Sequence, residues 1–446
     1  MTVETREPTA LWWDRRFRSF WAGQSISQLG DQVSGLALPL IAVAALHAST
    51  AQVAALTALT WTPNLLGIAL GAWIDHRVRK RRLMVAADLA RALILLSLPA
   101  AYLFGHVTLI QLYAVALFTG SASVLFNTTY ASFFTRIVSP DAYLDANSKL
   151  SASRSVAYVA GPALGGALVQ AFSAPIAVVA DAVSFLASAG LLGGIRIDES
   201  AAAADAVSAD GNEAEGSEPS LARRIREGWL FVVHDPILRA SLGCSTTINF
   251  FTFLSGGGLL VLFASRELGL SAGVIGVTLG VGATGSFLGA VVAARVAGRM
   301  GIGAAMALGS VLFPAPTAIA AAAAGPMWAK VAALASSEFL AGVGVMLFDV
   351  NQNSLIAAAV PDGLRSRVAG VYNSVNYGIR PVGALVGGAL GTAFGLRATL
   401  LIAAVGGSAA VLWLFPSPIP RIRVLSDVRP RVESAGPAES VDAATT

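Results

Sequence analysis

Long apolar segments alternate with short polar connections along almost the whole chain. Each segment is close to the roughly 20 residues that a helix needs to cross a bilayer. None alternates apolar with polar residues, as the strands of a membrane barrel do. Because a bilayer cannot satisfy exposed backbone groups, we predict helices. We expect twelve, at residues 19–46, 52–74, 83–104, 108–134, 147–171, 174–194, 238–263, 271–294, 302–324, 328–350, 366–391 and 396–415.

The composition agrees with an all-α membrane protein. Hydrophobic residues make up 55% of the chain and charged residues only 13%, whereas soluble domains carry about 25% charged residues. The mean hydropathy is +0.68. The net charge of +4 is too small to suggest a nucleic-acid partner, so we expect the lipid bilayer to surround most of the chain.

The positive charges predict the orientation. Of the 30 Lys and Arg residues, 24 fall in the two tails or in every second connection. This pattern places both termini in the cytoplasm of a multi-pass protein in the cell membrane, because cytoplasmic connections are enriched in Lys and Arg. The exceptions are Arg266, Lys330 and Arg397 on the outer side, and Arg91, Arg154 and Arg380 within helices.

The chain divides into two six-helix halves with polar segments around them. Residues 197–220 are acidic and have no bulky apolar side chains beyond Ile197 and Val207, which predicts a disordered linker. The basic amphipathic stretch 221–234 is expected to be a helix on the cytoplasmic surface. The expected parts are a cytoplasmic tail (1–18), a first half (19–196), a linker (197–236), a second half (237–415) and a disordered cytoplasmic tail (416–446).

The two halves contain a weak internal repeat. Residues 138–168 include VSPDAYL and GPALGGAL, and residues 360–390 include VPDGL and RPVGALVGGAL. Small residues allow helices to approach closely, so we predict helix packing at Gly161, Pro162, Gly165 and Gly166. Two repeated halves with a binding site between them are typical of secondary transporters.

Residues 71–82, GAWIDHRVRKRR, resemble the signature that the major facilitator superfamily carries between its second and third helices. The resemblance implies a cytoplasmic gate formed by Gly71, Asp75, Arg79, Lys80 and Arg81, with Arg136 as a partner of Asp75. The run at 161–166 resembles the helix 5 signature of exporters in that superfamily. The counterpart of the gate in the second half, residues 294–301, lacks the aspartate.

The segment 17–40 resembles the branch that includes macrolide efflux proteins and the enterobactin exporter, also called transmembrane secretion effectors. The resemblance implies the twelve-helix major facilitator fold, in which helices 1, 4, 7 and 10 line a central cavity. It also implies export of amphipathic drugs, macrolides or siderophore-like metabolites, hence a role in multidrug resistance.

Carboxyl groups inside a membrane are costly and therefore indicate function. Asp31 and Glu338 lie near the middle of the first and tenth segments, and a carboxyl there can take up a proton on one side and release it on the other. We rank Asp31 above Glu338 as the proton-coupling residue. A buried polar group hydrogen-bonded to a neighbouring helix is the alternative for both. Polar residues at similar depth are Ser121, Ser123, Asn127 and Asn249.

Other charged residues within the segments suggest ion pairs or contacts with a substrate. Asp88 and Arg91 are one turn apart and are expected to form a structural ion pair. For Asp181 and Asp349 a structural use is favoured. The remaining candidates for contacts with a substrate are Arg154, Arg380 and Tyr377. Apolar contacts to a ligand could come from eight aromatic residues, for most of which packing against lipid or other helices is favoured: Trp61, Tyr113, Tyr130, Tyr158, Phe250, Phe251, Phe253 and Tyr377.

Several function classes find no support in the sequence. None of the three lysines stands in a P-loop, and the chain has no HExxH or GxSxG motif. The single cysteine, Cys244, and four scattered histidines offer no metal site. We therefore expect no enzyme and no cofactor, but a monomeric proton-coupled antiporter for a small molecule. An importer, a membrane sensor and a channel remain alternatives.

Overall fold

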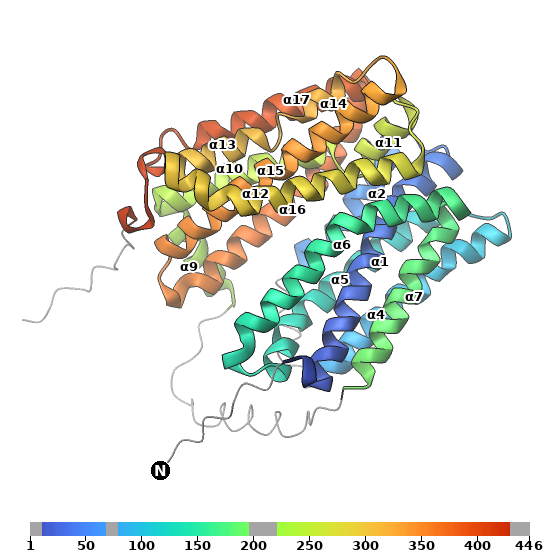
Figure 1. Cartoon of the computed structure of the whole chain (residues 1–446), viewed down its shortest axis with the longest axis horizontal. Coiled ribbons are helices and arrows are strands. Elements are labelled where there is room, and N and C mark those ends of the chain that lie inside the picture. The colour runs from blue at the N-terminus through green and yellow to red at the C-terminus, as the bar shows by residue number, and fades with distance from the viewer. Residues whose placement is uncertain (1–10, 68–78, 196–220, 429–446) are drawn as a thin grey trace, which may run out of the picture.

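The computed structural model describes residues 11–67, 79–195 and 221–428. Every regular element in these ranges is a helix. The helices form two bundles that lie side by side, one built from the first half of the chain and one from the second (Figure 1).

The first bundle contains six long helices. They are α1 (Arg15–Leu40), α2 (Thr50–Trp61), α4 (Lys80–Leu103), α5 (Leu109–Ile137), α6 (Tyr143–Phe172) and α7 (Ala174–Gly193). Polar side chains fix several starts: Ser49 and Gln52 form a capping box on α2, and Thr108 accepts a hydrogen bond from the first turn of α5. Helix α1 continues as a π-helical turn over Ile41–Ala45.

The second bundle has the same number of membrane segments, but two of them are interrupted. Its helices are α9 (Leu221–His234), α10 (Pro236–Ser255), α11 (Gly258–Arg266), α12 (Ala272–Met300), α13 (Ile302–Leu312), α14 (Thr317–Ala321), α15 (Met327–Ala359), α16 (Arg365–Phe394) and α17 (Leu396–Ser408). The pairs α10–α11 and α13–α14 each occupy one segment that the sequence predicts to be continuous.

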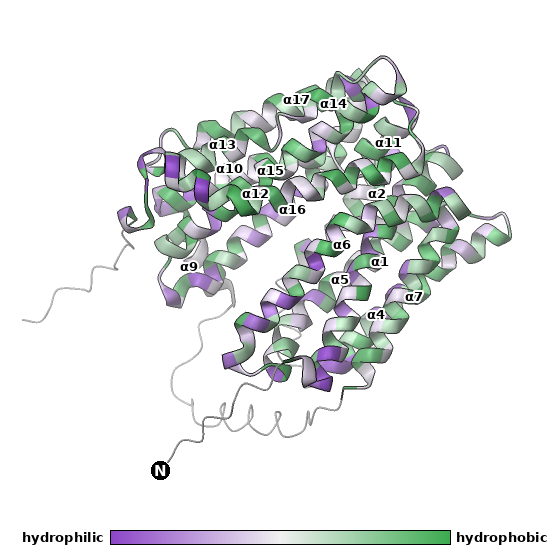
Figure 2. Cartoon of the chain, viewed as in Figure 1, coloured by the Kyte–Doolittle hydropathy of each residue, from purple (hydrophilic) through white to green (hydrophobic). Residues whose placement is uncertain are grey.

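Ten helical segments in the described residues are long and apolar enough to cross a membrane. The other two predicted segments correspond to α2, which is followed by the undescribed residues 68–78, and to α16, which has 30 residues but carries several polar ones. The prediction of an all-helical membrane protein is therefore confirmed. Hydrophilic residues gather at the end of the molecule where α1 begins and where α9 lies (Figure 2).

Helix α6 packs through glycines on two faces. Gly161 and Gly165 lie against α1 of the same half, and a Cβ added at Gly165 would stand 3.1 Å from the backbone of α1. The next residue, Gly166, lies against Gly276 of α12 in the other half, and the carbonyl of Pro162 also contacts Gly276. One helix thus joins its own half to the opposite one.

Helix α16 repeats this arrangement in the second half. Gly383 and Gly387 lie against the backbone of α10, whereas Gly388 lies against Ala54 of α2 in the first half. The three glycines have the same spacing as Gly161, Gly165 and Gly166. The repeat in the sequence therefore corresponds to a repeat in helix packing.

The contacts between the halves gather at one end of the molecule. The bundles lie close together near α2 and α11 and diverge toward the end at which α1 begins (Figure 1). Hydrogen bonds that cross this seam join Gly258 N–H to Thr57 Oγ1 (3.3 Å), Arg266 Nη2 to the Val43 carbonyl (3.4 Å) and Ser271 Oγ to Gln170 Oε1 (3.2 Å).

The tail differs from the sequence prediction, whereas the helix predicted over 221–234 is present as α9. The tail was expected to be disordered from residue 416, but residues 416–428 pack against α13: the Gly303 amide donates to the Ile422 carbonyl at 3.0 Å, and Ile419 is fully buried. Helix α9 docks on α16 through an ion pair between Glu227 and Arg367 at 2.8 Å. Residues 197–220 and 429–446 lie outside the described part of the chain.

Candidate functional site

An acidic cluster lies inside the first half, where α1, α4 and α7 meet. Its carboxyl groups belong to Asp31 on α1, Asp88 on α4 and Asp181 on α7. The glycines of α1 make the approach possible, because Gly23 and Gly30 face small side chains of α7. Three acids from three helices are thereby brought within electrostatic range of one another and of Arg91.

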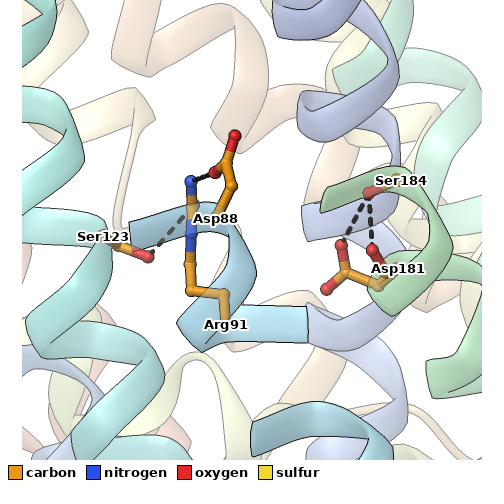
Figure 3. Close-up of polar contacts among 5 residues, drawn as sticks. All are labelled: Asp88, Arg91, Ser123, Asp181 and Ser184. Carbon is orange, nitrogen blue, oxygen red and sulfur yellow. Dashed lines mark hydrogen bonds and ion pairs between the residues drawn. The ribbon is translucent and has the colours of Figure 1, made fainter. Parts of the chain in front are cut away.

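Arg91 is held in a fixed position by neighbours on three sides. It forms an ion pair with Asp88, one turn away on α4, and both side chains are almost completely buried. Its Nη1 donates to Ser123 Oγ of α5 at 3.4 Å (Figure 3). Its guanidinium also lies over the rings of Phe126 and Phe185, at 4.7 and 4.0 Å from their centroids. The predicted pairing of Asp88 with Arg91 is present, and the pair also contacts α5 and α7.

Asp181 is buried against the backbone of α1. Its exposed fraction is 1%, and Ser184, one turn along α7, donates a hydrogen bond to its Oδ1 at 3.1 Å (Figure 3). A Cβ added at Gly30 would collide with both side chains. The glycine thus makes room for the carboxyl group directly beside Asp31.

Asp31 lies on a different face of α1 from the residues that pack against α7 and α6. Gly30 faces α7 and Gln32 faces α6, so the residue between them lies on a third face of the helix. Gly35, one turn further on that face, lines a cavity with residues of α10 and α11. Asp31 is exposed, and its carboxyl group lies within electrostatic range of Asp88 and Arg91 on α4 and of Asp181 on α7.

The charges in this cluster do not balance. Arg91 compensates one carboxylate, and two further carboxyl groups remain near it. Uncompensated negative charge inside a membrane protein is costly, so the cluster must take up protons or a cation. Among the described residues, most buried polar atoms without a hydrogen-bond partner also lie on these helices, at Trp21, Gln24, Gln28, Ser34, Asp88, Arg91 and Ser188. The site is suited to exchanging protons.

A second cluster joins the two halves around Arg380 of α16. The guanidinium lies 4.4 Å from the ring of Trp61 on α2, 4.9 Å from Phe253 on α10 and 4.3 Å from Tyr377. Its Nε donates to Asn249 Oδ1 of α10 at 3.0 Å. The structure therefore brings three substrate candidates together, Asn249, Tyr377 and Arg380, and adds Trp61 from the opposite half.

The other candidates lie apart from these clusters. Glu338 lines the cavity in the second half. Ser121 bonds only to its own helix in the described structure, at the Leu117 carbonyl. Asn127 and Arg154 are exposed on α5 and α6, and Arg154 acts electrostatically on Tyr130 of α5. Within the described ranges, no group of three or more His, Cys, Asp or Glu side chains is placed to hold a metal ion.

The predicted gate is only partly described. Gly71 and Asp75 lie outside the described residues. Arg79 and Lys80 begin α4, and Arg136 stands in the last turn of α5. Arg81 Nη1 donates to the Ile195 carbonyl at 2.6 Å and thus caps the end of α7 within the first half.

Sequence reasoning did not place Asp181 or Ser184 in the site. Asp181 was recognised as a membrane acid, but its contact with Gly30 joins distant parts of the chain. The available signal was local: Asp181 and Ser184 are three residues apart and share one face of α7.

Two repeated bundles of membrane helices, joined by a glycine-rich seam and carrying buried charged clusters, define a multi-pass membrane transporter. The profile of the Major Facilitator Superfamily matches residues 20–384 and 242–441. The chain therefore belongs to this superfamily of secondary transporters, whose members are not enzymes.

The chain is also similar to individual characterised proteins. It is 24% identical over 391 residues to the multidrug efflux pump Tap of Mycolicibacterium fortuitum, covering 83% of this chain and 88% of Tap. A bacterial homologue of the lysosomal transporter Spinster, inward-facing, matches 94% of this chain and 100% of its own, with a TM-score of 0.71 and 15% identity.

A bacterial homologue of the iron transporter ferroportin has been solved in two states. Its inward-facing structure matches 90% of this chain and 99% of its own, with a TM-score of 0.67 and 19% identity. Its outward-facing structure gives a TM-score of 0.57, with 17% identity and coverage of 90% and 98%. At these identities the likeness establishes the fold.

Proposed function

We propose that this protein is a proton-coupled antiporter that exports small amphipathic molecules by alternating access. The observation that carries the proposal is the acidic cluster of the first half, in which Arg91 serves three carboxyl groups. Asp31 is the coupling residue because it belongs to this cluster and, unlike Asp88 and Asp181, is exposed. Asp181 and the Asp88–Arg91 pair set its electrostatic surroundings.

The mechanism follows from charge balance. When Asp31 is ionised, the cluster carries excess negative charge, which favours either a proton or an open, hydrated arrangement. A proton taken up from the outside neutralises the group and lowers the cost of enclosing it while the halves rearrange. Release of that proton on the opposite side resets the cluster for the next cycle.

The seam supports an inward-facing assignment of the structure. The halves are joined near α2 and α11 and diverge at the end where α1 begins. We assign that diverging end, where α1 and α4 begin with Arg15, Arg16 and Lys80, to the cytoplasm, because cytoplasmic ends of membrane helices are enriched in Lys and Arg. The better match to the inward-facing ferroportin homologue agrees with this assignment.

Export is favoured over import by two similarities. Tap is an efflux pump, and the segment 17–40 resembles macrolide and enterobactin exporters. We therefore place the protein with exporters of drugs or siderophore-like metabolites, acting as a monomer in the cell membrane. Import and a sensing or channel role are the competing outcomes of the test below.

The test uses the full chain in proteoliposomes with a pH-sensitive dye enclosed. After a proton gradient is imposed, a transported dye such as ethidium should dissipate it, and Asp31→Asn should reduce that substrate-driven proton flux at least tenfold. Asp362→Asn, which removes the same charge from an exposed turn, is the control. Full gradient-driven transport by Asp31→Asn would refute the assignment. Growth of an export-deficient bacterium on macrolides, dyes and siderophores then identifies the substrate and the direction.

A further inference from the structure

A cavity of about 280 Å³ is lined mainly by the second half, with Gly35 of α1 as its lining residue from the first half. It forms where α10 ends at Ser255 and α11 begins at Gly258. Gly257 has a φ of +58°, a conformation that glycine adopts most readily, so the chain turns there without a side chain. The break thereby opens the wall of the bundle toward α15.

Most of the cavity wall is apolar. Its lining includes Phe251, Leu260, Leu279, Phe313, Ala341 and Ala403. Four hydroxyl groups also line the cavity, those of Thr252, Ser255, Thr317 and Ser337. The Ser337 hydroxyl already donates to the Pro316 carbonyl at 2.7 Å. A space with this lining fits an organic group better than a hydrated ion.

Glu338 of α15 is the charged residue of the lining. In the described structure it has no ion pair or hydrogen bond to another side chain, and no neighbouring charge acts on it. Gly282 of α12 leaves room beside it, since a Cβ there would lie 3.2 Å from Glu338 Cβ. The carboxyl group therefore stands in an apolar cavity without a compensating cation.

We propose that this cavity binds the cationic head group of the exported molecule, an alkylated ammonium, with Glu338 as its counter-ion. An ammonium that carries alkyl groups satisfies the carboxylate and the apolar wall together. A metal cation is less suited, because it requires about six oxygen ligands and the cavity offers one carboxylate. The inference rests on the proposed transport function and specifies its substrate class.

The place of the cavity relates it to proton coupling. Gly35 of α1 is part of the lining, and Asp31 lies one turn away on the same face of that helix. A cation bound beside Glu338 would therefore lie in a cavity whose wall includes Gly35, one helical turn from the proton on Asp31. In this proposal Glu338 binds the substrate, and Asp31 carries the coupled proton.

The test measures binding of radiolabelled tetraethylammonium to the purified full-length protein, without a proton gradient. The wild-type protein should bind it saturably, and Glu338→Gln should weaken binding at least tenfold. Ala341→Leu, which narrows the cavity but keeps the carboxylate, should also weaken binding. Glu338→Asp should retain most of the affinity, which separates loss of charge from misfolding. The control is Asp362→Asn, at an exposed site whose side chain is 88% accessible.

Two results would overturn the inference. Equal affinity of the wild-type protein and a folded Glu338→Gln variant would remove Glu338 from the site. Displacement of tetraethylammonium by sodium ions at matched ionic strength, seen in the wild type only, would assign the site to a metal cation. Because binding is measured at equilibrium, a failure of proton-driven transport leaves this result unaffected, and the two proposals fail separately.

Discussion

Arg91 shows how one buried side chain sets the charge of a whole region. It pairs with Asp88, bonds to Ser123 and lies between two aromatic rings. Each contact restricts the guanidinium, which therefore stays near Asp31 and Asp181. Aromatic faces suit this role, because they attract a cation without accepting its protons.

Removal of Arg91 should be strongly destabilising. Arg91→Gln leaves the buried Asp88 carboxylate unpaired, and loss of one partner of a buried ion pair typically costs about 3–5 kcal/mol. The double variant Arg91→Gln with Asp88→Asn should recover part of that loss, because no stranded charge remains. Thermal unfolding of the purified proteins in detergent gives both values. The single variant Asp88→Asn completes the comparison. If the double variant loses as much stability as Arg91→Gln and Asp88→Asn lose in sum, the ion pair does not stabilise the protein.

The acids Asp88, Asp181 and Glu338 differ in how well the sequence predicts their contacts. The spacing of Asp88 and Arg91 predicts their pairing, because residues three apart meet on any helix. The contact of Asp181 with Gly30 cannot be predicted in this way, since it depends on how α7 packs on α1. The position of Glu338 near the middle of its segment was predictable, but its cavity was not.

At the scale of helices, the sequence predicts segments better than their ends and interruptions. α15 was expected over 328–350, yet it runs from Met327 to Ala359. Its 33 residues extend about 50 Å, well beyond a 30 Å hydrocarbon core, and hydropathy cannot detect a helix that continues into water. The break between α10 and α11 was also not predicted, because the SGGG run from Ser255 to Gly258 lies inside an apolar segment.

The packing of α1 on α7 gives an element-scale prediction. Gly30→Ala should lower stability by about 1–3 kcal/mol, because the new methyl group collides with Ser184 and Asp181 in a filled interface. Gly190→Ala on α7 is the matched control, since no atom lies within 4 Å of the added carbon. It should be neutral or slightly stabilising, as alanine favours helix. Unfolding midpoints of the two variants test this, and equal midpoints would contradict the proposed packing.

At the scale of the whole molecule, the repeat explains how two halves can move as units. Each half packs internally through Gly161 and Gly165 or through Gly383 and Gly387, while Gly166 and Gly388 contact the opposite half. The contacts between halves use mainly backbone and small residues, which can separate without breaking a core. The Arg380 cluster adds a cation–π contact across the halves, to Trp61, worth about 0.5–2 kcal/mol, an amount that a substrate or proton can offset.

A cross-link across the seam should therefore stop transport. Gln170 and Ser271 are both exposed and hydrogen-bonded across the halves at 3.2 Å, and the single native cysteine, Cys244, is buried. The variant Gln170→Cys with Ser271→Cys, joined by a short bismaleimide, should lose substrate-driven proton flux because the seam cannot open. Glu267→Cys with Arg397→Cys, an ion pair at 3.1 Å within the second half, should transport normally after the same treatment, because each half moves as a body. Undiminished flux in the cross-linked seam variant would show that these contacts stay closed throughout the cycle, and alternating access about this seam would have to be abandoned.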